Sequence, residues 1–277
     1  MGLNAELQRR WPSAYWTARN GQTILRRPAE ARALWRTIDE RRRPGVAPTP
    51  PSPRPRVLVY HAVDQPEFFV NNIASRRFRR QLQLALDEGY RFGSLDDVAA
   101  AEPDDALLSI SFDDGYRSAG SFAPTLAEFG APWTMFVTST WSDGDAWRPE
   151  LFLDWTELED LLDSGVHIGS HSATHPDFGS LEESAARVEL ETSRETIRQR
   201  LGVEVTDFAI PFGNAANWSD QAHRAALDVG YTRIYAQSEE LRFPGTVGRS
   251  FVSGFDSDRT FVATLRGAFD RWEEPAA

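Results

Sequence analysis

The stretch Ala106-Leu107-Leu108-Ser109-Ile110-Ser111-Phe112-Asp113-Asp114-Gly115-Tyr116 decides the fold and places the chemistry. Its first half is a short apolar run typical of a buried strand. That strand ends in two adjacent carboxylates and a glycine that permits a sharp turn. Neighbouring carboxylates repel each other unless a cation lies beside them. We therefore expect a metal ion near Asp113 and Asp114, with His171 and His175 as matching ligands from a later segment.

The composition limits what kind of protein this is. The chain has 277 residues, no cysteine and a formal net charge of -11, and all 30 of its basic residues are arginine. Without thiolates, any metal must be held by His, Asp or Glu, which suits zinc or a harder divalent ion. The negative charge argues against a nucleic-acid partner. No apolar run is long enough to span a membrane, and no signal peptide is evident, so we expect a cytoplasmic protein.

The charge pattern divides the chain into three parts. Residues 1–43 form a basic amphipathic extension. Residues 1–56 contain 12 arginines and only four acidic residues. Ala31, Leu34 and Ile38 recur at helical spacing there. The favoured interpretation is a helix that docks on the main domain; the alternative is a helix that touches a membrane surface or a partner protein. Residues 44–55 contain six prolines and form a linker, and residues 56–277 form the main domain.

Strand-like and helix-like segments alternate from Arg56 onward, in about seven units. This alternation predicts an α/β fold with a parallel sheet covered by helices. At this length we expect a distorted (β/α) barrel, in which chemistry gathers at the C-terminal ends of the strands. The expected strands are 57–61, 90–93, 106–110, 133–138, 166–170, 206–210, 231–235 and 248–252, and the expected helices are 77–88, 95–101, 118–129, 154–163, 181–201, 218–229 and 258–272, with 139–153 as a long loop.

Two motifs together predict a metal site. His171 and His175 are spaced i, i+4, which would put both imidazoles on one face of a helical turn. One aspartate would complete a three-ligand site, and the other would be free to act as a base on water. Taken alone, the Asp-Asp pair could be a helix cap, and the histidine pair could be a solvated helix face. Their joint placement at strand ends favours a site.

These residues resemble a known family. Ser111-Phe-Asp-Asp-Gly115, Gly165-Val-His-Ile-Gly-Ser-His-Ser-Ala-Thr-His175 and Phe208-Ala-Ile-Pro-Phe-Gly213 are similar, in order and spacing, to the motifs of the NodB-homology polysaccharide deacetylases. The resemblance covers Arg56 to the C-terminus. It implies a distorted barrel, removal of acetyl groups from sugars, and a divalent metal that is most often Zn²⁺, with Co²⁺, Mn²⁺, Ni²⁺ or Fe²⁺ as alternatives.

The resemblance also implies roles for individual residues. Asp113 corresponds to the catalytic base. Asp114, His171 and His175 correspond to the metal ligands. The backbone N–H of Phe212 corresponds to the donor that stabilises the oxyanion.

The sequence departs from the family pattern at two places. Ala209 stands where the family usually has the arginine that orients the base, and members acting on poly-N-acetylglucosamine also have alanine there. The late Leu-x-His motif, which supplies the acid, has no histidine here, because the corresponding residues around Arg249 are Arg-Ser-Phe-Val. We choose His61 as the acid or a substrate contact; a structural histidine is the alternative. His167 is expected to point into the barrel, and His223 to be solvated.

Aromatic residues near the strand ends are candidates for binding sugar. Pro211, Gly213 and Trp218 are predicted to contact substrate. Flat rings suit stacking on sugars, and the alternative is that these rings anchor loops. The sequence thus predicts a deacetylase of an N-acetylated polysaccharide or glycan precursor. Two alternatives are a hydrolase of a non-sugar amide and a weakened, glycan-binding barrel. The tryptophans considered are Trp141, Trp147, Trp155 and Trp218.

Overall fold

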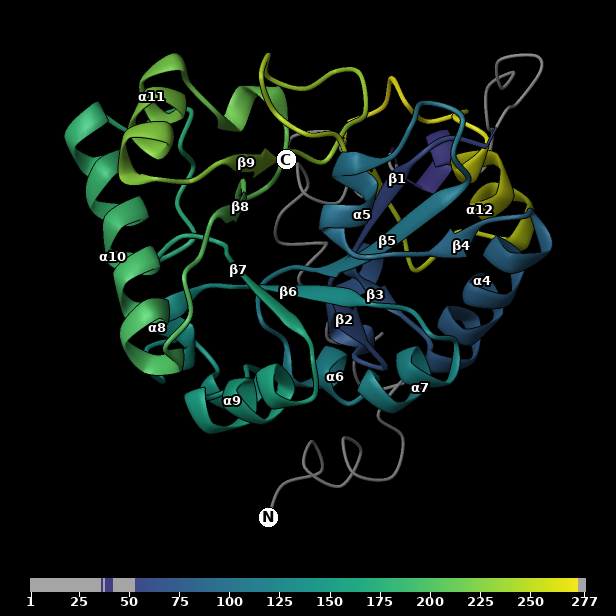
Figure 1. The fold of residues 1–277 in the computed structure, drawn as a ribbon, viewed down its shortest axis with the longest axis horizontal. Coiled ribbons are helices and arrows are strands. Elements are labelled where there is room, and N and C mark those ends of the chain that lie inside the picture. The colour runs from purple at the N-terminus through teal and green to yellow at the C-terminus, as the bar shows by residue number, and fades with distance from the viewer. Residues whose placement is uncertain (1–35, 37, 42–52, 274–277) are drawn as a thin grey trace.

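The computed structural model describes residues 36, 38–41 and 53–273, and Figure 1 shows a curled parallel sheet with helices around it. Every strand pair in the main sheet is parallel. Such a sheet is buried on both faces, which explains the near-continuous apolar strands. The order is β10 (Ser250–Phe251), β1 (Arg56–Tyr60), β5 (Leu107–Phe112), β6 (Trp133–Val137), β7 (His167–Ser170), β8 (Asp207–Ala209) and β9 (Arg233–Tyr235), with β4 (Arg91–Phe92) pairing β5 off this path.

The sheet curls toward closure through the segment that leads into β10. Val247 forms a parallel bridge with Tyr235 at the end of β9. Three residues later, Ser250 lies opposite Leu58 of β1. One short segment therefore touches both ends of the strand order, and the expected α/β distorted barrel is confirmed.

Helices cover the outside of the sheet, and their caps follow from the sequence. Ser94 forms a capping box with Asp97 at the start of α5. Asp154 does the same with Glu157 for α9. The helices are α4 (Ser75–Asp87), α5 (Leu95–Ala100), α6 (Arg117–Gly120), α7 (Ala123–Glu128), α8 (Ser139–Ser142), α9 (Trp155–Asp163), α10 (Glu183–Leu201), α11 (Asp220–Val229) and α12 (Asp258–Leu265), with 3-10 turns η1 (Pro66–Asn71), η2 (Pro149–Leu151) and η3 (Ala215–Asn217).

Several element predictions were wrong in detail. The helix expected at 118–129 is two helices, α6 and α7, because the ring of Pro124 would clash with the carbonyl of Gly120 in a continuous helix. The loop expected at 139–153 contains α8 and η2. The small sheet of β2 (Ala62–Val63) and β3 (Asn72–Ile73), joined through η1, was not predicted. Helix α12 ends at Leu265, well before residue 272.

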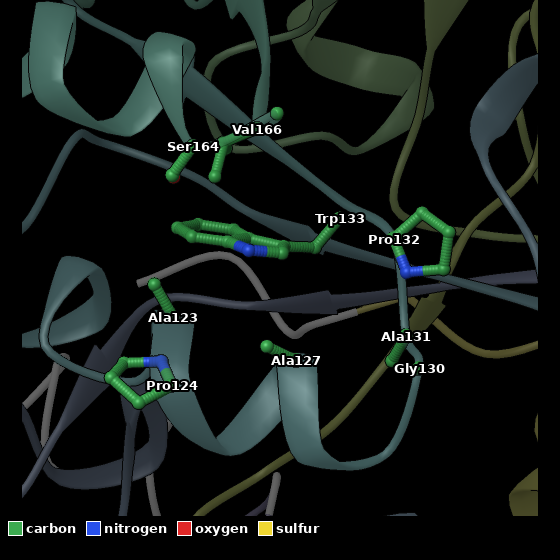
Figure 2. Close-up of a pocket in the computed structure, with 10 residues that line it drawn as sticks. Ala123, Pro124, Ala127, Gly130, Ala131, Pro132, Trp133, Ser164 and Val166 are labelled. Atoms are coloured by element: carbon green, nitrogen blue, oxygen red, sulfur yellow. The ribbon is translucent and has the colours of Figure 1, made fainter.

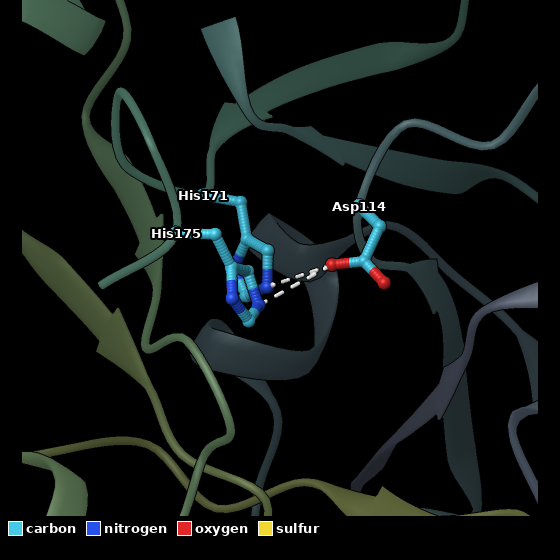
Figure 3. A group of neighbouring side chains, drawn as sticks. All are labelled: Asp114, His171 and His175. Atoms are coloured by element: carbon cyan, nitrogen blue, oxygen red, sulfur yellow. Dashed lines mark ion pairs between the residues drawn. The ribbon is translucent and has the colours of Figure 1, made fainter. Parts of the chain in front are cut away.

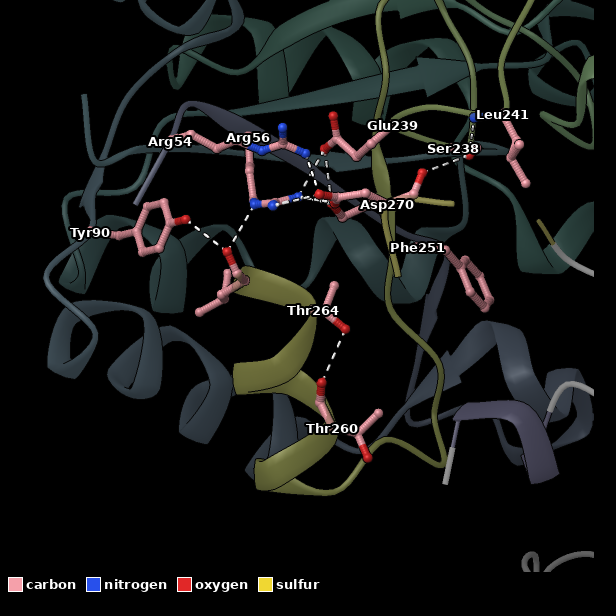
Figure 4. A network of polar contacts seen from close by, with 12 residues as sticks. Arg54, Arg56, Tyr90, Ser238, Glu239, Leu241, Phe251, Thr260, Thr264 and Asp270 are labelled. Carbon is pink, nitrogen blue, oxygen red and sulfur yellow. Dashed lines mark hydrogen bonds and ion pairs between the residues drawn. The ribbon is translucent and has the colours of Figure 1, made fainter. Parts of the chain in front are cut away.

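A buried ion network ties the C-terminal segment to the first strand (Figure 4). Arg56 begins β1 and is almost fully buried, and its Nη1 donates to Asp270 Oδ1 at 2.6 Å and to Ser250 Oγ at 3.2 Å. Arg54 pairs with the same carboxylate. A charge this deeply buried is tolerated only when it is paired and hydrogen-bonded. The network therefore fixes the strand start that lies at the opposite end of the barrel from Asp113.

The described part of the N-terminal extension packs on the barrel. Ile38 is buried in a cluster with Val59 and Phe251. Arg41 donates through Nε to Asp256 Oδ1 at 2.8 Å and through Nη2 to the carbonyl of Phe251 at 2.9 Å. For these residues the docking interpretation is confirmed. The rest of the extension and most of the predicted linker lie outside the described residues. Within the described part of the chain, no helix is both long and apolar enough to cross a membrane.

Candidate active site

The two carboxylates lie in a sharp turn at the C-terminal end of β5. The N–H of Asp113 continues the ladder by donating to the carbonyl of Tyr60 at 2.9 Å. Asp114 then adopts a φ of 71° and Gly115 a φ of 76°. A left-handed conformation at a non-glycine residue is uncommon and is typical of functional sites. This turn points the two neighbouring side chains in different directions, so they can have different partners.

The two histidines lie on a loop after β7. The expected helical turn was wrong, because residues 171–178 form no helix. The rings meet instead because Ser172 and His175 both have positive φ, at 70° and 63°. The loop is held from outside by Glu189 of α10, whose carboxylate accepts hydrogen bonds from the N–H of Ala173 at 3.1 Å and of Thr174 at 2.9 Å. The Oγ of Ser172 accepts from the N–H of His175 at 2.8 Å.

Asp114, His171 and His175 converge as the sequence predicted (Figure 3). One ligand atom from each of the three lies within 4.8 Å of the others. Asp114 Oδ1 is 3.4 Å from Nε2 of His171 and 3.5 Å from Nε2 of His175. The opposite ring nitrogen of His171 lies 2.9 Å from the carbonyl of Ala209, which leaves Nε2 directed at the carboxylate. Metal-binding histidines are commonly held by such a second hydrogen bond.

The donor set fits a divalent cation such as zinc. Asp114 Oδ1 is buried and has no hydrogen-bond partner among the described residues, so it has an unmet need for a cation or donor. Two imidazoles and one carboxylate make the three-ligand set of catalytic zinc sites, which keep a fourth position open. The structure thus supports the predicted ligands without identifying the metal.

The protonation states are suited to binding a cation. Burial raises the pKa of Asp114, but the interaction with His171, whose Nε2 lies 3.4 Å away, and the nearby His175 outweigh it, and the pKa falls well below its ordinary value. Burial lowers the pKa of His175 to about 4. Burial also lowers the pKa of His171, but the charges of Asp113 and Asp114 raise it more. Metal ligands must be deprotonated, so Asp114 and His175 are already in the binding state at neutral pH.

The base candidate, Asp113, is clamped by Arg249, a residue that the sequence interpretation gave no role. Nη1 and Nη2 of Arg249 each donate to one oxygen of Asp113 at 2.7 Å. Arg249 is 1% exposed, and its Nε donates to the carbonyl of Ala236 at 3.1 Å. Burial raises the pKa of Asp113, but Arg249 and His171 lower it to below its ordinary value. Asp113 is therefore held ionised in one orientation by a bidentate pair.

The position of Arg249 gives Asp113 a guanidinium partner although position 209 is alanine. Ala209 is buried at the end of β8, where the family pattern has arginine. Arg249 comes instead from the segment that closes the barrel between β9 and β10. The sequence signal that could have found it is an arginine within a predicted buried strand, since a buried guanidinium requires a carboxylate partner.

The Pro-Phe-Gly turn presents the predicted oxyanion donor at the surface. Phe212 has a φ of 64° and is 53% exposed, and its ring packs edge-on to His175 at 4.6 Å. Pro211 and Gly213 are buried, so they shape the turn. A Cβ added at Gly213 would lie 2.4 Å from Cβ of Gln237, which explains the glycine. Among the described residues, no acceptor takes the Phe212 N–H.

His61 reaches the same site from the end of β1. Its charge interacts with Asp114 and Asp113, and its ring lies 6.2 Å from that of Phe251. Burial lowers the pKa of His61, and the two carboxylates counteract part of this effect. Its Nδ1 has no hydrogen-bond partner among the described residues. This placement fits a group that meets substrate, and its role remains a prediction.

Other predicted positions need correction. Trp218 is 3% exposed, packs on Phe178 and Phe208, and donates through Nε1 to His223, so it offers no face to a substrate. That bond also makes His223 a partly packed residue. His167, expected to point into the barrel, is substantially exposed, and its Nε2 lies 3.0 Å from Asp207. These three residues are therefore separate from the site.

A well-formed cavity lies away from this chemistry. It has a volume of about 530 Å³ and lies between α7 and the segments that lead into β6 and β7 (Figure 2). Pro132 and Trp133 line it at the start of β6. The catalytic candidates lie at the opposite, C-terminal ends of the strands. The cavity is therefore not part of the site.

Comparison with known proteins agrees with this geometry. Residues 100–234 match the family model described as polysaccharide deacetylase. The Bacillus subtilis protein YxkH, named for the same family, is 22% identical over 181 residues, which cover 63% of this chain and 61% of the relative. An uncharacterized protein of Streptomyces coelicolor is 27% identical over 131 residues, covering 47% of this chain and 48% of that relative. The chain thus spans about half to three fifths of the length of these curated relatives.

Solved structures share the fold. The Aggregatibacter actinomycetemcomitans de-N-acetylase superposes with a TM-score of 0.65 at 19% identity, covering 76% of this chain and 98% of that one. The Streptococcus pyogenes deacetylase PplD gives 0.64 at 20% identity, with the same coverage. IcaB from Ammonifex degensii gives 0.61 at 20% identity, covering 77% of this chain and 96% of that one. At these identities the structural likeness bears on the fold.

Proposed function

We propose, from the match of residues 100–234 to the polysaccharide deacetylase family model, that the protein is a metal-dependent hydrolase that removes acetyl groups from N-acetylated sugars of a polysaccharide or glycan precursor. The observation that carries the proposal is the separation of the two carboxylates. Asp114 faces two imidazoles, while Asp113 is clamped by Arg249. One carboxylate can thus serve a cation while its neighbour remains free to accept a proton. The name of the de-N-acetylase neighbour supports a C–N bond as the one cleaved.

In this mechanism Asp113 is the general base. It accepts a proton from the water that attacks the acetyl carbonyl carbon, and a tetrahedral species with a negative oxygen forms. The bidentate bond to Arg249 keeps the carboxylate ionised and in one orientation. General base catalysis of this kind contributes about 10²–10⁴ in rate. A divalent ion held by Asp114, His171 and His175 would polarise the carbonyl and acidify the water.

The remaining steps use the turn at Phe212 and the end of β1. The N–H of Phe212 donates to the negative oxygen, a contact usually worth about 10²–10³ in kcat. Collapse of the tetrahedral species breaks the C–N bond, and the departing nitrogen takes a proton. We assign that proton to His61, which interacts electrostatically with both carboxylates and must be protonated before this step. The products are acetate and the free amine of the sugar.

The structure weighs against the weakened-barrel alternative. That alternative rested on Ala209 and on the missing late histidine. Arg249 supplies the guanidinium that position 209 lacks, and it does so with two 2.7 Å hydrogen bonds. The support for a competent base is therefore greater than the sequence alone suggested.

Acetate release tests the proposal. The metal-loaded protein should release acetate from acetylated oligosaccharides, lose this activity with a chelator, and regain it when the metal is added back. Asp113→Asn should abolish release without abolishing metal binding. Faster release of other acyl groups or of ammonia from non-sugar amides would favour the alternative hydrolase. Sugar binding without any hydrolysis at saturating metal would overturn the proposal.

A further inference from the structure

A row of packed aromatic rings begins at the candidate metal site. The ring of Trp141 stacks on His175, with centroids 5.4 Å apart and planes at 22°. Phe152 follows at 4.7 Å from Trp141, and Tyr116 stacks on Phe152 at 5.0 Å. Tyr116 comes two residues after Asp114 in the chain. The row therefore runs from a metal-ligand candidate on one loop back to the carboxylate turn on another.

The row continues from Tyr116 to the surface. Phe68 lies 4.6 Å from Tyr116, and Trp147 meets Phe68 edge-on at 6.4 Å. Trp147 is 65% exposed, the highest exposed fraction among the large apolar side chains that the structure describes. Leaving an indole in water forgoes the free energy that its burial would provide. An exposed tryptophan beside a candidate site therefore points to a ligand.

The loop that carries Trp147 is fixed to the carboxylate turn. The N–H of Leu153 donates to the carbonyl of Gly115 at 2.9 Å, and Phe152 forms an antiparallel bridge with Tyr116. On the other side of Trp147, the N–H of Asp145 donates to the carbonyl of Thr140 at 3.0 Å. The exposed ring is thus held at a set position relative to Asp114.

The surroundings of Trp147 indicate what it binds. Arg148 lies with its guanidinium carbon 5.8 Å from the indole centroid, and Arg148 pairs with Glu150 at 2.7 Å. A flat apolar face with charged hydrogen-bonding groups at its edge matches a sugar ring, which has C–H faces and hydroxyl edges. A membrane or a protein partner would call for a larger apolar patch. The other tryptophans of the site region are packed or hydrogen-bonded, as at Trp141 and Trp155.

We propose that Trp147, with Phe68 beside it, is a subsite that stacks on a sugar ring of the glycan chain at a distance from the unit that is deacetylated. This inference rests on the proposed function for its ligand class. The subsite would make the protein prefer oligomers over single acetylated sugars. It would leave the chemical step unchanged, because within the described part of the chain Trp147 is connected to the metal-ligand residues through other rings.

Binding of oligosaccharides tests the subsite independently of catalysis. The full-length, metal-loaded Asp113→Asn protein is titrated by calorimetry with N-acetylglucosamine and with its dimer and longer oligomers. Trp147→Ala should weaken binding of longer oligomers about two- to tenfold, the usual worth of one aromatic contact. It should leave binding of the monomer unchanged. Trp147→Phe should restore most of the loss, and Leu227→Ala, which removes an exposed side chain on α11, should have no effect.

Kinetics with the active protein provide the second measurement. Trp147→Ala should raise KM for longer oligomers by the same factor while kcat, and the rate on a small acetyl ester, stay constant. Equal weakening for monomer and oligomer, or no weakening for either, would overturn the subsite. If the native protein releases no acetate, the proposed function fails, but the calorimetric comparison still decides whether Trp147 holds a sugar.

Discussion

Replacing Arg249 by methionine should separate the role of this residue in catalysis from its role in stability. Arg249 and Asp113 are both buried and share two hydrogen bonds of 2.7 Å. Removing one partner of a buried pair leaves an uncompensated charge and costs about 3–5 kcal/mol. We therefore expect Arg249→Met to lose about that much unfolding free energy at neutral pH, measured by urea denaturation.

The same substitution should impair the base. With Arg249 gone, burial is the largest influence on Asp113, so the pKa of its carboxyl rises. The acidic limb of the kcat/KM profile should then move to higher pH. At neutral pH kcat should fall by about a hundredfold or more, because general base catalysis is worth about 10²–10⁴. Arg249→Lys keeps the charge without the bidentate geometry, so its kcat should lie between those of Arg249→Met and the native protein.

A second buried arginine supplies the matched control. Arg56 is as buried as Arg249 and pairs with Asp270 at 2.6 Å, at the other end of the barrel. Arg56→Met should cost a similar unfolding free energy, yet leave kcat per folded molecule and the pH profile unchanged. Our reasoning is refuted if folded Arg249→Met keeps the native kcat and pH profile. It is also refuted if both variants lower kcat equally.

Three further predictions follow from other contacts. Glu189→Ala should weaken metal binding about 10–100-fold in chelator competition, as losses of outer contacts at metal sites do, whereas Glu191→Ala on the same helix should not. Arg41→Ala should cost about 3–5 kcal/mol of unfolding free energy because its pair with Asp256 is buried; a cost under about 1 kcal/mol, typical of exposed pairs, would contradict this. Burial raises the pKa of Asp207, but its histidine and arginine partners lower it below the ordinary 3.8. The stabilisation by this carboxylate is therefore full above that value and is lost as pH falls through the lower folded-state pKa. Asp207→Asn should be less stable at neutral pH, with the difference narrowing below about pH 4; a constant difference in urea titrations across this range would contradict the assignment.

The metal-ligand candidates could be found from the sequence because each motif is local. Asp114 follows directly from the end of an apolar strand, and His171 follows from the end of another. Parallel strands bring their C-terminal ends to one edge, so the two meet whatever the details of the loops. The predicted helical turn between His171 and His175 was wrong, yet the pair still converges. Ser172 and His175, both with left-handed backbone conformations, bring the two imidazoles together in this loop, as a helical turn would have done.

The sequence could not show which tryptophan ring is exposed and therefore able to stack on a sugar. From the sequence, Trp218 was predicted to contact substrate, and Trp147 was only one of the other aromatic rings considered. Their difference depends on what packs over each ring. Trp218 packs against Phe178 and Phe208. Among the residues that the structure describes, Trp147 has an edge contact with Phe68 and the guanidinium of Arg148 nearby. Such packing is set by segments far apart in the chain.

The clamp on Asp113 shows why a missing motif residue is weak evidence for lost activity. The base needs a buried cation within hydrogen-bond reach, and a closed barrel offers that point to inward-facing residues of several strands. Position 209, on β8, is alanine and cannot supply this charge. Arg249 takes it from the closing segment, 136 residues along the chain from Asp113. The base requires a positive charge beside it, and the fold can bring that charge from any segment that reaches this point. A comparison of motifs along the chain detects the missing arginine at position 209 but does not detect its replacement by Arg249. The same reasoning applies to the absent late histidine, because His61, just after the end of β1, interacts electrostatically with both carboxylates. If His61→Ala retains the native kcat, the assignment of His61 as the acid is wrong. The pairing of Arg249 with Asp113 would not be affected, because it depends on separate hydrogen bonds.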